Sequence, residues 1–351
     1  MSPARKPRRR SGFWSLFLLL IVAAAGYWAV DRYLGFADAP IAGLHPGDTI
    51  EVKQGESFAD VVQTLKSRSS RVQPLEWQAL GRQLGVAGKL QVGEYALEPG
   101  TTPRMLLMRM RQGKVISHRF TIVEGWNIRE LRAALARAQP LQHDAAKLDD
   151  AALMKALGHA GLHPEGRFLP ETYQYTRGDG ELSVLRRAFD AMTVELDTAW
   201  ATRVPDLPVQ SKEQALALAS IVEKETGIAE ERPAIAGVFV RRLRIGMRLQ
   251  TDPTVIYGMG AAYAGNIHKA DLLTDTPYNT YTRDGLPPTP IAMPGRAALQ
   301  AATHPAAGDT LYFVAVGDGS GRHVFTRSLA EHQAAVRQYL QRYRAAGAAT
   351  P

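Results

Sequence analysis

The chain has 351 residues, of which 45% are hydrophobic and 22% are charged, so it has enough apolar material for more than one folded domain. The net charge is +8, but without five basic residues near the N-terminus it is only +3; these are Arg5, Lys6, Arg8, Arg9 and Arg10. No stripe of basic and aromatic residues follows residue 35, so no nucleic-acid partner is indicated. The absence of cysteine excludes disulfides, thiolate catalysis and cysteine-ligated zinc.

A hydrophobic segment follows the basic cluster, from Gly12 to Val30, and its nineteen residues include no charged side chain. As a helix it would be about 28 Å long at ~1.5 Å per residue, close to the ~30 Å hydrocarbon core of a bilayer. Aromatic rings favour the membrane interface, and Trp14, Tyr27 and Trp28 lie near its two ends. We therefore predict a transmembrane helix over residues 12–30, after a basic cytoplasmic tail of residues 1–11.

The distribution of basic residues predicts the orientation of this helix. Because the basic cluster precedes the helix and Asp31-Arg32 after it is neutral, the positive-inside rule keeps the N-terminus in the cytoplasm. We predict a single-pass protein of the inner (cytoplasmic) membrane with its larger part in the periplasm. The alternative is a cleaved signal peptide, because residues 23–25 are alanines suited to a peptidase. Against it, the apolar run continues to Val30, beyond a signal core of ~7–15 residues.

Residues 31–45 are predicted to be a linker, and residues 46–115 a small subdomain. The expected elements are a strand at 49–52, a helix capped by Ser57, a helix at 75–84, a strand at 93–97 and a helix at 105–111. A strand, two helices and a strand in this order resemble the LysM-type fold, a glycan-binding module. Many small units share this order, so a structural adaptor without a ligand stays open as the alternative.

Residues 116–345 form the larger predicted domain, of mixed α/β type, and residues 346–351 a disordered tail. Its first helix follows a strand at 118–123 and begins at Asn127, with Glu130 three positions later. Further helices are expected at 151–161, 182–200, 212–227 and 233–246, and mostly loops over 247–300. A hairpin of strands 311–316 and 323–326 follows. The last expected helix begins after Ser328 and frays from about Arg344. The helix at 212–227 opens on Ser211-x-x-Gln214, a capping box. The fold class predicted for the whole chain is α+β.

Several common sites are missing from the sequence. It lacks the GxxxxGK[ST] phosphate loop, a GxGxxG after a strand, the GxSxG nucleophile elbow and the HExxH zinc motif. His159 and His163 are four residues apart, as in helical zinc sites, but Gly161 between them and Pro164 after them argue against a firm helix. We predict neither a metal site nor a cofactor.

Two acidic residues lie at the C-terminal end of a mostly apolar predicted helix. Residues 215–222 are apolar or small, and Glu223 and Glu225 follow, so we expect a buried helix whose acids emerge at one end. A carboxyl group in this position is poorly solvated, which raises its pKa toward the range of a general acid. Small residues surround Glu223 on the helix, whereas bulky ones surround Glu225. We therefore predict that Glu223 is the acid and that Glu225 is a supporting, substrate-binding or ion-pairing residue. The alternative that Glu223 has only a structural role, paired with Arg or Lys, stays open.

Two later segments carry polar groups suited to a sugar. The candidate binding residues are Gln250, Thr251 and Asp252, in a loop stopped by Pro253, and Tyr278, Asn279 and Tyr281, before a run rich in glycine and proline. Amides and hydroxyls bond sugar hydroxyls, tyrosine rings stack on pyranose faces, and proline-rich loops hold such groups with little loss of entropy. Ordinary loop chemistry explains either segment alone. Together with the acid, they predict a glycan cleft.

Long sequence runs carry a resemblance to a known family. They are ASIVEKET at 219–226, RRLRIGMRLQTDPTVIYG at 241–258, YNTY at 278–281, GLPP at 285–288, HP at 304–305 and EGRFLPETY at 165–173. On these runs the chain resembles the endolytic murein transglycosylases, bacterial enzymes with one membrane span. The resemblance covers nearly the whole chain from about residue 45 and is looser over the small N-terminal unit.

The resemblance implies cleavage of the β-1,4 bond between N-acetylmuramic acid and N-acetylglucosamine in nascent peptidoglycan, without net water. The first Glu of VEKET, Glu223, would protonate the glycosidic oxygen and then accept a proton from the muramic 6-hydroxyl as a 1,6-anhydro ring forms. The second carboxylate that ordinary glycosidases need is not required. The family is thought to end strand elongation near the penicillin-binding synthases, which are implied as partners.

Two other functions remain open at this point. A lysozyme-like hydrolase would use Glu223 as the acid and Asp252 as the second carboxylate, and it would leave reducing ends. A non-enzymatic glycan-binding scaffold of the cell-wall synthesis machinery would keep its function after Glu223 is replaced by glutamine.

Overall fold

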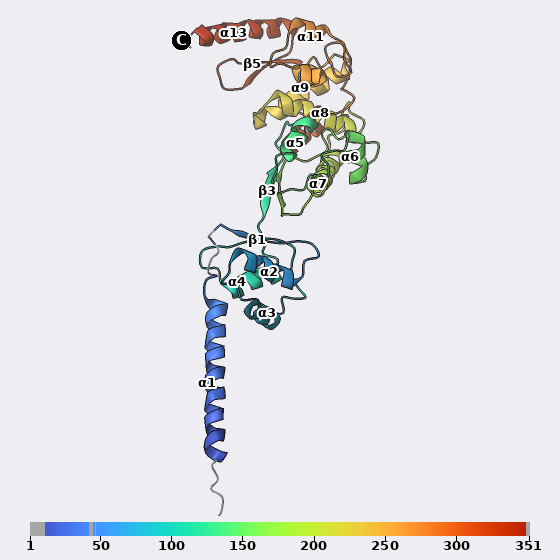
Figure 1. The fold of residues 1–351 in the computed structure, drawn as a ribbon. Helices are drawn as coiled ribbons and strands as arrows, with labels where there is room; N and C mark the ends of the chain where they lie inside the picture. Colours follow the sequence, from blue (N-terminus) through green and yellow to red (C-terminus); the bar gives the residue numbers. More distant parts are fainter. Residues whose placement is uncertain (1–10, 42–44, 46, 349–351) are drawn as a thin grey trace, which may run out of the picture. The chain divides into compact units, whose positions relative to one another are not determined.

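The structure is a computed structural model that describes residues 11–41, 45 and 47–348, and its chain divides into two compact units (Figure 1). Unit 1 comprises Met1–His118 and Thr176–Gly178, and unit 2 comprises Arg119–Tyr175 and Asp179–Pro351. Helices dominate both units, and the described strands form three separate two-stranded sheets. This mixture confirms the predicted α+β class. Most of the predicted basic tail and the last three residues of the chain lie outside the described residues.

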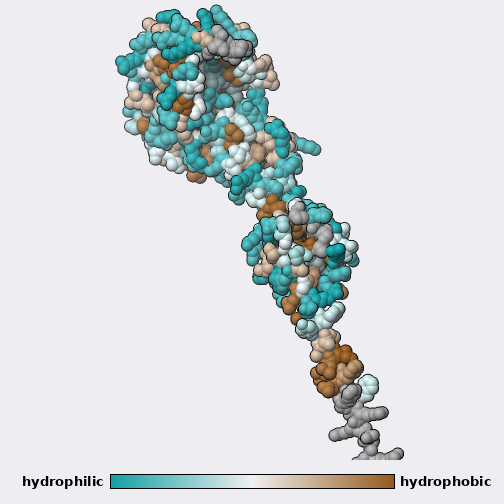
Figure 2. All heavy atoms as spheres, turned by 90° about the vertical axis from the view of Figure 1, so that its left-hand side faces the viewer, coloured by the Kyte–Doolittle hydropathy of each residue, from teal (hydrophilic) through white to brown (hydrophobic). Residues whose placement is uncertain are grey.

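Helix α1 (Ser11–Asp38) begins unit 1 and is longer than the predicted transmembrane segment. Its part Trp14–Asp38 is long and apolar enough to cross a membrane, and none of its apolar window is buried in protein. Figure 2 shows apolar side chains of this helix as brown spheres without protein around them. The helix continues through the first part of the predicted linker, because Ala37 packs into the core of unit 1 and Asp38 pairs with Arg104 at 2.7 Å.

The rest of unit 1 follows the predicted order of strand, two helices and strand. β1 (Thr49–Val52) pairs antiparallel with β2 (Gly93–Ala96); α2 (Phe58–Arg68) and α3 (Pro74–Gln83) lie between them in sequence, and α4 (Pro103–Gln112) follows. Ser57 caps α2 in a reciprocal box with Asp60, which confirms the predicted helix start. A β-carbon on Gly81 would lie 2.3 Å from the ring of Phe58, so glycine allows α2 and α3 to pack closely.

Unit 2 contains the remaining elements, and its first strand begins at the boundary residue His118. In chain order they are β3 (His118–Thr121), α5 (Ile128–Leu135), α6 (Asp150–Leu157), β4 (Thr172–Tyr175), α7 (Glu181–Ala201), α8 (Lys212–Glu225), α9 (Arg232–Arg244), α10 (Asp252–Met259), α11 (Lys269–Leu273), α12 (Arg296–Thr303), β5 (Tyr312–Ala315), β6 (His323–Thr326) and α13 (Leu329–Ala348). β3 pairs with β4, and β5 pairs antiparallel with β6 in the predicted hairpin. The predicted starts of α5, α8 and α13 are confirmed, because Asn127, Ser211 and Ser328 each accept a backbone hydrogen bond from the residue three positions later.

Residues 247–300 were predicted to be mostly loops, and the structure differs from this prediction. This segment contains α10, α11 and α12. Pro253 does not stop a segment but occupies the first turn of α10, where a missing N–H costs no helical hydrogen bond. Sequence patterns miss such helices because they are short; α11 has five residues.

Three helix ends also differ from prediction. α6 ends at Leu157 because Gly158 adopts the left-handed conformation (φ 94°), so His159 and His163 both lie outside the helix. The side chain of Gln214 accepts from the backbone N–H of Gln210 and not from that of Ser211, so the predicted box at α8 is only half formed. α13 continues to Ala348, past the predicted point of fraying.

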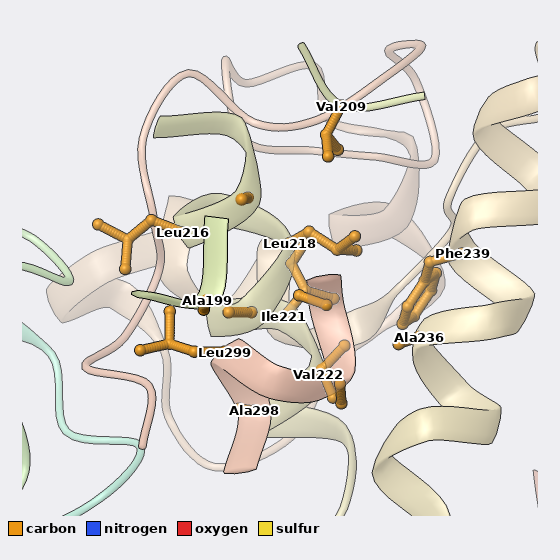
Figure 3. Packing of buried hydrophobic residues seen from close by; sticks show 14 of the residues in the cluster. Ala199, Val209, Leu216, Leu218, Ile221, Val222, Ala236, Phe239, Ala298 and Leu299 are labelled. Atoms are coloured by element: carbon orange, nitrogen blue, oxygen red, sulfur yellow. The ribbon is translucent and has the colours of Figure 1, made fainter. Parts of the chain in front are cut away.

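Helix α8 lies at the centre of the larger core of unit 2. Its residues 215–222 are all buried, which confirms the prediction of a buried apolar helix. α7, α9 and α12 pack around it. Figure 3 shows Ile221 and Val222 of α8 near Phe239 of α9 and Leu299 of α12. This packing fixes the end of α8, which carries the two acids.

Candidate active site

The two candidate acids lie at the C-terminal end of α8. The helix ends at Glu225 because Thr226 adopts an extended conformation (φ −147°, ψ 137°). Lys224 is exposed, whereas Glu223 and Glu225, taken as whole residues with their backbone, are only partly exposed. Because each helical step turns by about 100°, acids two positions apart face different parts of unit 2.

Both carboxylate oxygens of Glu223 are bound by other parts of the protein. Oε1 lies 3.1 Å from Nη2 of Arg232, and Oε2 accepts a 2.9 Å hydrogen bond from the backbone N–H of Gly295. Only 5% of the Glu223 side chain is exposed. Burial raises its pKa, while the Gly295 hydrogen bond and the Arg232 charge oppose the rise. The arrangement is that of a helix-end acid paired with arginine, the structural alternative given above.

Part of the space beside Glu223 is occupied by other segments of unit 2. α12 packs closely against α8, and the hydroxyl of Ser220 accepts a 3.0 Å hydrogen bond from the backbone N–H of Ile291. Glu223 lines neither of the two cavities described below. Among the small neighbours of Glu223, Ser220 allows close packing of a chain segment against α8.

Glu225, by contrast, lines a cavity of about 370 Å³. Its wall is formed by Glu225, Phe239, Arg242, Leu249, Gln250, Thr251, Asp252, Tyr281, Tyr312, Phe313, Leu329 and His332. Four of the predicted binding residues, namely Gln250, Thr251, Asp252 and Tyr281, thus share one cavity with Glu225. The sequence argument expected the open side at Glu223, whereas the residue that lines this cavity is Glu225.

The surroundings of Glu225 raise its pKa, so that a substantial fraction of the carboxyl group is protonated near pH 7. Burial raises its pKa to about 7, and the charge of Asp252 adds to the rise. The hydroxyl of Thr251 donates a hydrogen bond to Oε1, which together with the charge of Arg242 moderates the rise. Glu225 can therefore hold a proton at neutral pH and also present it to the cavity, as a general acid must.

The loop before α10 is held in place by the second predicted segment. Gln250 has a φ of 48°, in the left-handed region that costs a non-glycine residue about 1 kcal/mol or more. Its backbone N–H donates to the carbonyl oxygen of Thr280 at 3.1 Å. The N–H of Thr251 donates to the hydroxyl of Thr280, also at 3.1 Å. Thr280 therefore joins the two segments that were predicted to share a cleft.

Asp252 and Tyr281 are in direct contact in the cavity wall. The Tyr281 hydroxyl donates a 2.6 Å hydrogen bond to Oδ1 of Asp252. Burial, this hydrogen bond and the charge of Asp252 raise the pKa of Tyr281 above its usual value, so the phenol stays protonated. Asp252 is thus an acceptor that already has a partner within the protein.

Two predicted binding residues, Tyr278 and Asn279, are not among the residues that line the cavity. Asn279 is fully buried: its amide NH₂ donates to three backbone carbonyls of residues 271–274, and its oxygen accepts from the N–H of Tyr281 at 2.8 Å. Tyr278 packs against Tyr257, with ring centres 4.7 Å apart, and its hydroxyl contacts that of Thr289. These two residues shape the loop that carries Tyr281.

The sequence did not single out the part of the cavity wall formed by α9, β5 and α13. Arg242 of α9 donates to the backbone oxygens of Leu249 and Leu311, and its guanidinium lies 5.3 Å from the ring centre of Tyr312. His332 of α13 stacks on the same ring at 5.1 Å, and its Nδ1 has no hydrogen-bond partner within the described part of the chain. Arg242 lies in a run that carries the resemblance, but no local signal marks Tyr312 or His332.

A further buried acid, Glu165, lies outside this cavity. It is fully buried and accepts hydrogen bonds from the backbone N–H of Ile128 at 3.1 Å and from the hydroxyl of Tyr257 at 3.0 Å. Burial raises its pKa to about 7, against the effect of these hydrogen bonds. Because Tyr257 belongs to α10, Glu165 links the start of α5 to the helix that begins at Asp252.

Residues 50–338 match the YceG-like family, a range that includes every residue of the cavity wall. The chain belongs to this family. The endolytic murein transglycosylase of Bacillus subtilis (strain 168) is 31% identical over 308 residues, which span 83% of this chain and 84% of that protein. The endolytic murein transglycosylase of Streptococcus pneumoniae (strain R6) is 26% identical over 90% of this chain but only 64% of that protein. A crystal structure of a YceG-like protein from Listeria monocytogenes is 27% identical, with a TM-score of 0.53, and matches 83% of this chain and 99% of that one.

Proposed function

We propose that this protein is an endolytic peptidoglycan lytic transglycosylase with Glu225 as its catalytic acid and base. The names of its relatives support the reaction. The observation that carries the choice of residue is a carboxyl group with a pKa of about 7 in the wall of a polar cavity. Glu223, to which the sequence resemblance gives this role, is engaged by Arg232 and Gly295 and would hold the end of α8.

The proposed reaction needs one proton carrier. Protonated Glu225 gives its proton to the oxygen between N-acetylmuramic acid and N-acetylglucosamine as the bond from that oxygen to muramic C1 breaks. The Glu225 carboxylate then accepts the proton of the muramic 6-hydroxyl as that oxygen bonds to C1. The products are a 1,6-anhydro-muramic end and a free 4-hydroxyl on N-acetylglucosamine, with no net water. A pKa near 7 suits both the acid step and the base step.

The other polar groups of the cavity wall are proposed to bind the sugar. Gln250, Thr251 and Asp252 offer an amide, a hydroxyl and a carboxylate, and Tyr281 adds an aromatic ring. These groups match the hydroxyl and acetamido groups of the two sugars. Tyr278 and Asn279 would act indirectly, by positioning Tyr281.

The test is a digest of purified peptidoglycan strands with the full chain and its Glu225→Gln and Glu223→Gln variants, followed by mass spectrometry of the released muropeptides. We expect anhydro ends from the parent, a loss of about 10²-fold or more in rate for Glu225→Gln, and a much smaller loss for Glu223→Gln. Circular dichroism and gel filtration confirm that each variant is folded.

Other outcomes of this digest select other functions. If only Glu223→Gln abolishes cleavage, the acid is Glu223, as the resemblance implies. Reducing ends in place of anhydro ends would identify a lysozyme-like hydrolase in which Asp252 acts as the second carboxylate. If the parent chain is folded but cleaves no strand, the remaining function is that of a non-enzymatic glycan-binding scaffold of the cell-wall synthesis machinery.

We further propose that α1 anchors the protein in the cytoplasmic membrane, with the N-terminus inside and unit 2 in the periplasm. Its length and apolar surface support this location. Strands still under synthesis, and thus the penicillin-binding synthases, would be neighbours there. For the small subdomain of unit 1 we propose a LysM-like glycan-binding role, supported by its order of strand, helix, helix and strand.

A further inference from the structure

A second cavity of unit 2, of about 610 Å³, adjoins the segments that line the first. Its wall includes Lys224 and Pro253, the chain neighbours of Glu225 and Asp252. Consecutive Cα atoms are only about 3.8 Å apart. The end of α8 and the start of α10 therefore contribute neighbouring residues to the two cavities, and a peptide attached to a ligand in the first cavity can extend toward the second.

The polar part of the second cavity is basic. Arg129 of α5 and Lys224 of α8 are exposed, and neither forms an ion pair with any carboxylate of the described residues. Lys224 donates a 3.1 Å hydrogen bond to the backbone oxygen of Gly125, and the Arg129 guanidinium lies 6.0 Å from the ring centre of Tyr257. The carboxylate of Glu130 in this wall is already engaged, because it accepts a 2.8 Å hydrogen bond from the N–H of Asn127 at the helix cap.

The remainder of the wall is apolar. It is formed by aliphatic and aromatic side chains, among them Ala133, Ile256, Tyr257, Tyr263 and Ile291. The charge of Arg129 also acts on the buried Glu165, but no carboxylate in the part of the chain that the structure describes forms a direct ion pair with either cation. Such cations bind anionic groups through charge-assisted hydrogen bonds, and an apolar wall selects ligands with small hydrophobic parts. This combination fits a short peptide with free carboxylates and small aliphatic side chains.

We infer that the second cavity binds the acidic peptide that is attached to muramic acid in the glycan strand. The inference rests on the proposed function, since only a peptidoglycan strand brings such a peptide beside the sugar in the first cavity. Arg129 and Lys224 pair with carboxylates of this peptide, and the apolar wall covers its alanyl side chains. The protein thereby prefers strands that still carry their peptides.

The test compares two substrates: strands with intact peptides and the same strands after an amidase has removed the peptides. The full-length chain in detergent is measured beside the double variant Arg129→Gln/Lys224→Gln. The matched control is Arg137→Gln/Lys155→Gln, which removes the same charge from exposed sites that line neither cavity. For each protein, kcat and KM for release of anhydro ends are determined on both substrates.

We expect the parent to have the lower KM for peptide-bearing strands, and this preference to fall about tenfold in the Arg129/Lys224 variant. The control keeps the parent's preference. A parent without any preference for peptides, or an Arg129/Lys224 variant whose KM rises equally on both substrates, would overturn the inference while the proposed reaction stands. A parent that releases no anhydro ends from either substrate would overturn the proposed function itself.

Discussion

At the scale of single residues, the two acids of α8 show how partners decide the chemistry of a carboxyl group. Burial raises the pKa of both Glu223 and Glu225. Glu223 has a backbone N–H donor and an arginine, which stabilise its charged form, whereas Glu225 has the like charge of Asp252 nearby. Glu223 also has a like charge nearby, that of Glu124, so the cavity distinguishes the two acids: Glu225 lines it and is the one suited to release a proton to a ligand.

The pH dependence of the proposed reaction follows from the pKa of Glu225. The protonated form must start the reaction, so kcat/KM for anhydro-end release should fall as pH rises through about 7 and level off below it. In Thr251→Val the hydroxyl that stabilises the carboxylate is lost, so we expect the midpoint to move to higher pH. Glu223→Gln serves as the control and keeps the midpoint. A rate that increases through pH 7 would contradict the role of Glu225 as acid.

At the scale of elements, sequence patterns predict what local chemistry decides. The capped starts at Ser57 and Asn127 depend on residues three positions apart, and both are present in the structure. The burial of α8 follows from its apolar composition. The side on which α12 packs does not follow, because a helix buried on all sides has no amphipathic direction. For this reason the sequence does not decide how much room lies beside Glu223.

The same limit explains which part of the cavity the sequence missed. The segments around Gln250 and Tyr281 are rich in polar residues and were predicted together, and Thr280 does bring them together. Tyr312 and His332 come from a strand and a helix and lie 87 and 107 residues beyond Glu225, the end of α8 (312 − 225 and 332 − 225). Only tertiary packing, which a local pattern does not encode, places them in the same wall.

The packing of the segment before α12 against α8 leads to a prediction at Ser220. Its hydroxyl is the acceptor for the buried N–H of Ile291, and Ser220→Ala leaves that N–H without its partner. We expect a loss of about 1–2 kcal/mol in the free energy of unfolding, seen as a Tm several degrees lower in thermal unfolding. Ser183→Ala removes an exposed hydroxyl from α7 and should leave Tm nearly unchanged. An unchanged Tm for Ser220→Ala would show that the Ile291 N–H finds another acceptor.

At the scale of the whole molecule, the basic charge and the longest apolar surface occur at the same end of the chain. Five basic residues precede α1, and the rest of the sequence is close to neutral. A membrane anchor at this end would confine the cavity of unit 2 to the membrane surface, where its effective concentration toward strands under synthesis is high. The proposed preference for peptide-bearing strands suits that place, because a strand carries its peptides when it is made.

The anchor predicts that the mature protein keeps α1. We expect the full-length chain to stay in the membrane fraction after washing with alkaline carbonate, because an apolar helix of 25 residues is held by its contact with lipid and not by charge. N-terminal sequencing of that fraction should find a start before Gly12. In intact spheroplasts, an added protease should remove unit 2 and spare the N-terminal tail, as the positive-inside rule requires. A mature chain that starts near Gly26 and is released by the wash would instead identify a cleaved signal peptide, since the small residues at 23–25 would then have served as its cleavage site.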